Sequence, residues 1–459
     1  MSNQDHRDEG RGVNRSRREF LKRVSLMAGA LVAAPLLEAC QQGGPAPAPT
    51  SAPKAAPAAP TAAAAAAKPA ATAQQAPAKI AQTLKLGAAV ALTGPVSREG
   101  HMVKDGYEYW QKAINDKGGI DIGGSKYNVD IVFYDDESKS DTGTRLTEKL
   151  ITEDKVAFIL GPYSSGITQA TSVISERYGV LTIAPQANAD GIYERGYKYI
   201  FSILPAASTY LWGVIDMAST LNPKPTKVAI MVRDDPFGVA AGDGAAKHAQ
   251  DKGFQAVFKD KFPANATDVS SILTKVRETK PDMLLASTLF QDSVLITKQA
   301  KDLQFAPKLM AFTAGPALPD FVTSLGKDAE SVMGSEWWLP ILNFQGEPTL
   351  GSTKQYADGI QKAKGYEPGY HAASGSMAGL VLQLALQQAG KIDSNAVREA
   401  LLKMEPKTFW GPIGWNDQGK NVKGTSYPIQ IIGGKATSVW PEEGRQQPPK
   451  YPFPSWTGR

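Results

Sequence analysis

The chain has 459 residues, a formal net charge of +5, one cysteine and four histidines. One cysteine excludes an intrachain disulfide and a thiolate metal site, and the scattered histidines lack the spacing of metal ligands. Basic residues are dispersed along the chain rather than gathered on one face, which excludes nucleic-acid binding.

The first 39 residues have the pattern of an export signal. A twin-arginine pair, Arg17-Arg18, precedes a mildly apolar run from Val24 to Leu37. This run is too short to span a membrane, which takes about 20 residues. It ends in Leu37-Glu38-Ala39-Cys40, which resembles a lipobox. We therefore predict that Cys40 is lipidated and anchors the exported protein to the outer face of a membrane; an ordinary cleaved signal is the alternative.

Residues 40–82 are rich in Ala and Pro, a composition that favours an extended tether over a packed core. The body that follows is too long for one ordinary core and suits two lobes. We predict the first lobe to comprise 83–204 and 339–410, and the second to comprise 205–338 and 411–440, with a tail over 441–459.

Strand-like runs alternate with amphipathic helical runs through the body, which predicts an α/β fold with mostly parallel sheets. In the first half the predicted strands are 84–90, 129–134, 156–160, 180–184 and 199–203. The pattern then restarts, with strands at 228–232, 283–286, 309–312 and 332–339 and a long helix over 375–388. We expect two doubly wound lobes joined by crossing strands, with a ligand crevice at the carboxyl ends of the strands.

Several motifs occur in the order found in one family. They are Gly87–Pro95 at the first strand, Ile114–Ile120, Tyr134–Glu137, the turn Gly161–Ser165 with Gln169, and Gly411–Gly419 near the C-terminus. Over about 350 residues the body resembles the periplasmic binding proteins for leucine, isoleucine, valine and related amides. The resemblance implies a type I two-lobed fold, a monomer without a cofactor, and an ABC importer whose permeases and ATPases lie on other chains. A sensor of the same fold that reports to a signalling partner is the alternative.

The turn after 156–160 is the first candidate site. Ser164 and Ser165 follow an apolar strand and open a helix, where unpaired amides and a partial positive charge suit a carboxylate. From the residues alone, either serine is equally well a plain N-cap. The resemblance assigns the carboxylate-holding position to Ser165 and places Tyr163 in the same turn.

Further candidates also follow strands. Ala187 and Asn188 come after 180–184, and Asn188 stands where the family usually has Thr or Ser contacting both ends of an amino acid; a turn-forming Asn is the alternative. Asn still offers a donor and an acceptor. Phe237 stands where the family places an aromatic residue that covers the ligand from the second lobe, and Phe290 is a similar candidate. Trp337 and Trp338 cannot face the same side of a strand, so one is expected at the cleft and the other in the core.

One departure from the family concerns charge. Amino-acid binders of the family hold the ligand ammonium with an acid after the strand at 309–312, but Thr313–Pro316 contains none. A buried ammonium without a counter-charge is costly. Glu99 either supplies that charge from the other lobe or is a solvated loop charge. The sequence therefore leaves amides, urea-like solutes and aromatic or aliphatic acids as open as amino acids.

No reactive constellation supports catalysis, so we predict a binding protein and no enzyme. Pro162 breaks a nucleophile elbow around Ser164. The segment Gly414–Asn421 approaches a phosphate loop but ends in Asn and lacks the preceding strand and following helix.

Overall fold

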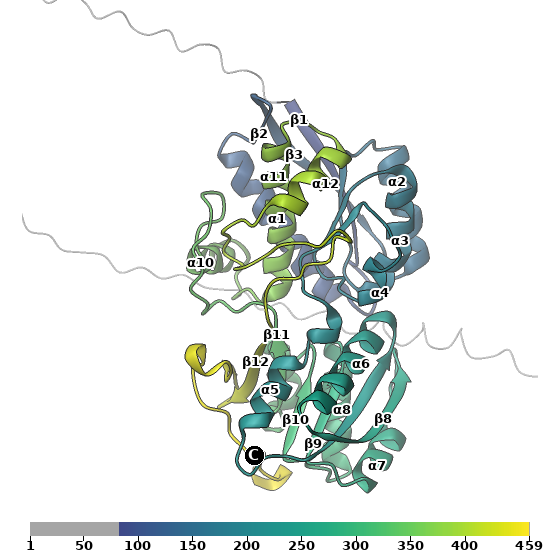
Figure 1. Ribbon diagram of the computed structural model, residues 1–459, viewed down its shortest axis with the longest axis vertical. Coiled ribbons are helices and arrows are strands. Elements are labelled where there is room, and N and C mark those ends of the chain that lie inside the picture. Colours follow the sequence, from purple (N-terminus) through teal and green to yellow (C-terminus); the bar gives the residue numbers. More distant parts are fainter. Residues whose placement is uncertain (1–81, 459) are drawn as a thin grey trace, which may run out of the picture. The chain divides into compact units, whose positions relative to one another are not determined.

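The computed structural model describes residues 82–458 (Figure 1). The predicted signal, Cys40 and the tether up to residue 81 lie outside the described residues. Within 82–458, no helix combines the length and apolar character that a membrane crossing requires.

The first lobe is built on a six-stranded sheet. Its order is β2-β3-β1-β4-β5-β6, and all neighbours are parallel except β2 with β3. The strands are β1 (Gln82–Val90), β2 (Ile120–Ile122), β3 (Ser125–Asp135), β4 (Phe158–Leu160), β5 (Thr182–Ala184) and β6 (Ile200–Ser202). Every residue of β4 and β5 is buried, as expected for parallel strands covered by helices on both faces.

Seven helices accompany this sheet. They are α1 (Ser97–Asp116), α2 (Ser140–Thr152), α3 (Ser165–Tyr178), α4 (Asp190–Tyr193), α10 (Thr353–Lys364), α11 (Tyr370–Ala389) and α12 (Ser394–Lys403). The helix α11, predicted over 375–388, starts earlier and packs closely on α1. A Cβ atom added at Gly379 would lie 2.1 Å from the Trp110 ring, so the absence of a side chain there allows the close approach.

The second lobe is built on a seven-stranded sheet of order β13-β12-β11-β10-β9-β7-β8. Its strands are β7 (Lys227–Asp234), β8 (Gln255–Pro263), β9 (Met283–Ser287), β10 (Leu309–Phe312), β11 (Met333–Glu336), β12 (Tyr427–Ile432) and β13 (Lys435–Ser438). The helices of this lobe are α5 (Trp212–Thr220), α6 (Pro236–Asp251), α7 (Ser270–Glu278), α8 (Phe290–Asp302) and α9 (Pro319–Leu325). Pairing is parallel from β8 to β11 and antiparallel at β12 and β13. The expected pair of mostly parallel, doubly wound sheets is confirmed.

The chain crosses between the lobes after β6, after β11 and before β12, and two of the crossings meet at a parallel bridge between Pro205 and Asn421. One predicted boundary is wrong. Residues 411–421 lie on the first sheet, because the Trp415 indole donates to the carbonyl of Ser202 (2.6 Å) and packs edge-on against Phe201. The return to the second lobe therefore follows Asn421 rather than beginning at 411.

Candidate ligand-binding site

A small cavity lies where the carboxyl ends of both sheets face each other. Six segments that follow strands contribute to its wall, after β4, β5, β6, β7, β9 and β10, and both lobes supply residues. The lining residues are Tyr163, Ser164, Ser165, Gln186, Asn188, Leu204, Tyr210, Asp235, Phe237, Leu289, Ala314 and Tyr370. This is the position at which doubly wound sheets bind ligands, next to the strand where the order of the sheet reverses.

The N-terminus of α3 forms one wall. Ser164 is its N-cap, and the Ser164 hydroxyl accepts a hydrogen bond from the Ile167 amide (3.3 Å). The backbone of Ser164 has φ 81° and ψ 143°, a region that non-glycine residues rarely adopt. The amides of Ser165 and Gly166 have no partner among the described residues. Since the helix dipole adds partial positive charge here, this wall suits an acceptor oxygen.

Two side chains beside this helix end have unused hydrogen-bonding capacity. The Ser165 hydroxyl accepts from the amides of Asn188 and Ala189, both at 3.2 Å, which leaves its own O–H free to donate. The Asn188 amide nitrogen donates to the Pro205 carbonyl (2.8 Å), but its Oδ1 is buried without a partner. The first lobe therefore presents a donor and an acceptor at neighbouring residues.

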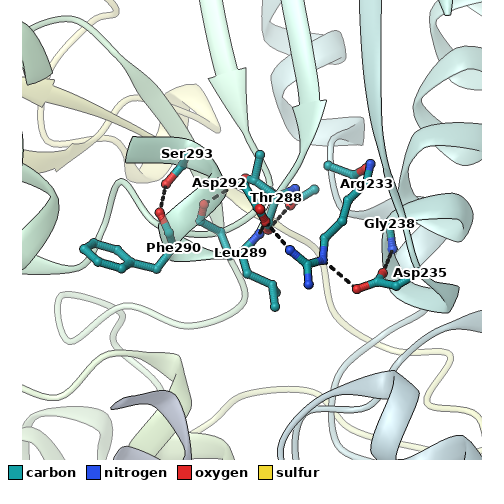
Figure 2. A network of polar contacts seen from close by, with 11 residues as sticks. Arg233, Asp235, Gly238, Thr288, Leu289, Phe290, Asp292 and Ser293 are labelled. Atoms are coloured by element: carbon teal, nitrogen blue, oxygen red, sulfur yellow. Dashed lines mark hydrogen bonds and ion pairs between the residues drawn. The ribbon is translucent and has the colours of Figure 1, made fainter. Parts of the chain in front are cut away.

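The facing wall comes from the second lobe and is charged (Figure 2). Arg233, at the end of β7, donates to Asp235 through Nε and to Asp292 through Nη1, both at 2.6 Å. Burial raises the pKa of Asp292 despite the nearby guanidinium. Burial also acts to lower the pKa of Arg233, but Asp292 and Asp235 hold it above its ordinary value.

Asp235 also caps α6, since its Oδ1 accepts from the Gly238 amide at 2.7 Å. Of the three residues in this network, Asp235 lines the cavity. The wall of the second lobe thus combines a carboxylate at the cavity with a guanidinium behind it.

Aromatic rings fill much of the remaining wall. Phe237 packs edge-on against Tyr210 with ring centroids 5.7 Å apart, and the Tyr210 hydroxyl donates to the Tyr370 hydroxyl (3.0 Å). These contacts leave a cavity of about 30 Å³. That volume admits a few water molecules at most, so an amino acid or aromatic acid requires the walls to move apart.

Five of the nine predicted contact residues line the cavity: Tyr163, Ser164, Ser165, Asn188 and Phe237. The other four lie next to it. Ala187 is buried between two lining residues, and its carbonyl accepts from the Tyr193 hydroxyl. The Trp337 ring packs against the cavity residue Tyr210, with ring centroids 4.8 Å apart. The Trp338 indole instead donates to the Phe409 carbonyl inside the first lobe.

Phe290 and Glu99 lie close to the boundary between the lobes. The guanidinium of Arg98, from α1, sits 4.5 Å from the centroid of the Phe290 ring. Glu99 is only 4 % exposed, so it is not a solvated loop charge, although it does not line the cavity. Burial raises the pKa of its carboxyl.

Sequence reasoning missed seven lining residues. Gln186 and Asp235 adjoin predicted positions and were within reach of the rule that ligands bind after strands. Leu289 and Ala314 follow β9 and β10 in the same way. Leu204 follows β6 and was within reach of the same rule. Tyr210 and Tyr370 come from the turn before α5 and the start of α11, and no local sequence signal marks them.

Two facing α/β lobes with a small cavity between them define a two-lobed solute-binding protein. The family model described as "Periplasmic binding protein" matches residues 83–436, so the chain belongs to this family. A curated relative, Leu/Ile/Val-binding protein homolog 7 of Brucella abortus (strain 2308), is 24% identical over 384 residues, which cover 80% of this chain and 94% of the relative. The predicted family membership is confirmed.

Solved structures share the fold. The branched-chain amino acid transporter substrate-binding protein LivJ from Streptococcus pneumoniae, in complex with isoleucine, superposes with a TM-score of 0.67 at 22% identity, over 77% of this chain and 98% of LivJ. A solute-binding protein of an ABC transporter from R. palustris, in complex with 4-hydroxybenzoate, gives a TM-score of 0.67 at 19% identity. The match covers 82% of this chain and 99% of that protein. The expected type I fold is confirmed. Among residues 82–458, no group of three or more His, Cys, Asp or Glu side chains is arranged to hold a metal ion.

Proposed function

We propose that this protein is the extracytoplasmic solute-binding component of an ABC importer. It captures a small carboxylate- or amide-bearing molecule between its two lobes and delivers it, as a monomer, to permease subunits on other chains. Cys40 carries the lipid that holds the mature protein at the membrane, and the Ala/Pro-rich tether gives the lobes reach.

The observation that carries this proposal is the unused hydrogen-bonding capacity of the Ser165 and Asn188 side chains. A free hydroxyl, two unpartnered helix amides and a buried unpartnered Oδ1 lie on one wall of the cavity. A buried acceptor without a partner costs about 1–3 kcal/mol, which a ligand N–H or O–H would recover. A ligand carboxylate can accept hydrogen bonds from the backbone N–H groups of the helix. Ligands that are carboxamides, α-amino acids or α-hydroxy acids also carry a donor for the Asn188 Oδ1.

A ligand screen tests the proposal. Thermal unfolding of the mature chain is followed with 20 amino acids, their amides, urea and a set of aliphatic and aromatic acids, each near 1 mM. A ligand that binds only the folded state raises its stability by about 2.7 kcal/mol at a hundred times its Kd, so true ligands raise the melting temperature, and the rise grows with the logarithm of the ligand concentration above Kd. A flat response across every class would contradict the proposed function. Genes for permeases and ATPases beside this one would favour import over sensing.

A further inference from the structure

Within residues 82–458, one donor nitrogen of the Arg233–Asp235–Asp292 network is not used in a hydrogen bond. Its guanidinium uses Nε for Asp235 and Nη1 for Asp292, and Nη2 has no partner among the described residues. In Figure 2 the guanidinium lies between Asp235 and Leu289, with its third nitrogen directed away from both carboxylates. Asp235 and Leu289 both line the cavity. The network therefore presents a carboxylate at the cavity wall, with the guanidinium and its free Nη2 directly behind two lining residues.

The surrounding contacts fix this donor in place. Asp292 accepts from the Leu289 amide (2.8 Å), and the Arg233 amide donates to the Ser287 hydroxyl (3.0 Å) at the end of β9. The Arg233 side chain is 10 % exposed and that of Asp292 is 4 % exposed. A planar guanidinium gripped by two carboxylates cannot rotate to serve a different geometry. Tyr163, on the opposite lobe, lies within the field of both Arg233 and Asp235, although burial is the main reason that its pKa is raised.

We propose that Arg233 and Asp235 bind the end of the ligand opposite the group held by the first lobe. They select a neutral group there that both accepts and donates a hydrogen bond. This inference rests on the proposed function, in which the first lobe holds the carboxylate or amide. A hydroxyl or carboxamide accepts from Arg233 Nη2 and donates to Asp235. A second carboxylate would face two aspartates against one arginine, and a methyl group would leave Nη2 of Arg233 without an acceptor and add no donor to Asp235.

Two ligand series that differ only in the group at the distal end test the proposal by calorimetry. The first is 4-hydroxybenzoate, 4-methylbenzoate and benzene-1,4-dicarboxylate, and the second is asparagine, leucine and aspartate. In each series that binds, we expect the hydroxyl or carboxamide member to bind about 10-fold or more tightly than both others, since a bond to a charged group contributes that much. A site built to hydrogen-bond a polar group rejects the analogue that lacks it.

The variant Arg233→Lys keeps the charge but loses the fixed three-way geometry, so the preference should fall to about threefold or less. The matched control is Lys308→Arg, which alters a cation paired with Asp282 (2.8 Å) just before β10, at the opposite end of the strands. The control should keep the full preference. Because each preference is a ratio measured on one sample, partial loss of folded protein does not change it.

Three results would overturn the inference and leave the proposed function standing. One is a methyl or dicarboxylate member that binds as well as the neutral polar member. Another is an unchanged preference in Arg233→Lys. The third is the failure of every member of both series to bind while another solute from the broad screen does. Failure of every solute in the screen would overturn the proposed function itself.

Discussion

Ser165 shows how one side chain can organise a wall of the cavity. Its hydroxyl oxygen ties the turn after β5 to the start of α3 by accepting from two amides, and the same hydroxyl keeps a hydrogen for a ligand. The sequence left two interpretations of the serine pair open, a helix cap or a ligand contact. The structure places the cap at Ser164, and Ser165 stays the predicted ligand contact.

Replacing Ser165 with alanine should weaken ligand binding about 10-fold or more, because an oxygen of the bound ligand loses a hydrogen bond in a dry site. The same change leaves the Asn188 and Ala189 amides unpaired, so the free energy of unfolding should also fall by about 1–3 kcal/mol. Calorimetry with the tightest solute from the screen measures the first effect and thermal unfolding the second. Ser172→Ala, which removes another buried hydroxyl of α3, is the control and should keep the affinity. Equal affinities of wild type and Ser165→Ala would exclude the contact.

Asp136 is the residue for which a pH effect is expected. It is fully buried, its Oδ2 has no partner, and burial raises its pKa to about 7. Between the unfolded pKa near 3.9 and this value, the folded chain binds the additional proton, so stability decreases as pH rises and levels off above pH 7. Asp136→Asn removes that charge, and its advantage in melting temperature over wild type should therefore grow from pH 5 to pH 8.

The adjacent acid provides a control of opposite sign. Although burial opposes it, hydrogen bonds from Thr93 and from the Glu137 and Leu92 amides lower the pKa of Asp135. Its contribution is present above the unfolded pKa and is lost as pH falls below it. Asp135→Asn should therefore cost stability at pH 7, and this loss should shrink in acid. The same pH trend in both variants would contradict the assignment.

At the scale of elements, the parallel strands buried on both faces were predictable, whereas β8, β12 and β13 were not. The bounds of β10 agree residue for residue with the prediction, because an apolar run buried on both faces leaves a strong signal. The strand β8 was missed since it lies at the edge of its sheet and carries Lys259, Asp260 and Lys261, which resemble a loop. The antiparallel pair β12 and β13 was also missed, although Gly433-Gly434 between them is a hairpin signal.

The same logic explains the site. Ser165, Asn188 and Phe237 were predictable because each directly follows a strand. Tyr210 and Tyr370 meet at the cavity from segments 160 residues apart. Only the tertiary arrangement of the crossings and α11 brings them together.

The N-cap residue of α3, Ser164, has a strained backbone conformation. Two substitutions at this position should therefore differ in their effect on stability. Ser164→Ala keeps the positive φ and loses the cap, so it should destabilise the protein by about 1 kcal/mol. Ser164→Gly also loses the hydroxyl, but glycine adopts this backbone without cost and should recover about 1 kcal/mol or more. Chemical denaturation compares the two variants. A glycine variant less stable than the alanine variant would show that the backbone conformation is not strained.

Two elements of different lobes are joined by one arginine. Arg98, on α1, pairs with Asp320 of α9 at 2.5 Å and covers Phe290 of α8. The Asp320 side chain is 54 % exposed, so the ion pair contributes about 0–1 kcal/mol, and the cation–π contact adds about 0.5–1 kcal/mol. Arg98→Ala should therefore shift the lobes toward an open state by up to about 30-fold, and Asp320→Asn by less.

Distances between spectroscopic labels at the exposed positions Lys126 and Lys280, one on each lobe, report this shift. Raised salt should weaken the contribution of the Arg98–Asp320 ion pair and leave that of the contact between Arg98 and Phe290. Lys112→Ala is the control, since its ion pair with Asp116 lies within α1. An interlobe distance in Arg98→Ala equal to that of wild type would show that the contact does not hold the lobes.

At the scale of the whole molecule, the cavity and the lobes belong to one mechanism. The volume of about 30 Å³ lies far below that of an amino acid, so the lobes must part to admit one. A ligand shifts this equilibrium only by its difference in affinity for the two states. Residues of both lobes line the cavity in this conformation, so a ligand that contacts both lobes would stabilise it over a more open one.

The proposed lipid anchor at Cys40 would determine where this protein binds its ligand. Cys40 is the only cysteine of the chain, and residues 82–458 contain no helix suited to crossing a membrane. If Cys40 carries lipid, Cys40→Ala should move the protein from the membrane fraction to the soluble extracytoplasmic fraction while the ligand affinity stays the same. Replacing Arg17-Arg18 by Lys-Lys tests export separately and should leave the precursor inside the cell, where lipidation cannot follow. Membrane retention of exported Cys40→Ala would mean that another contact, and not lipid at Cys40, holds the protein to the membrane.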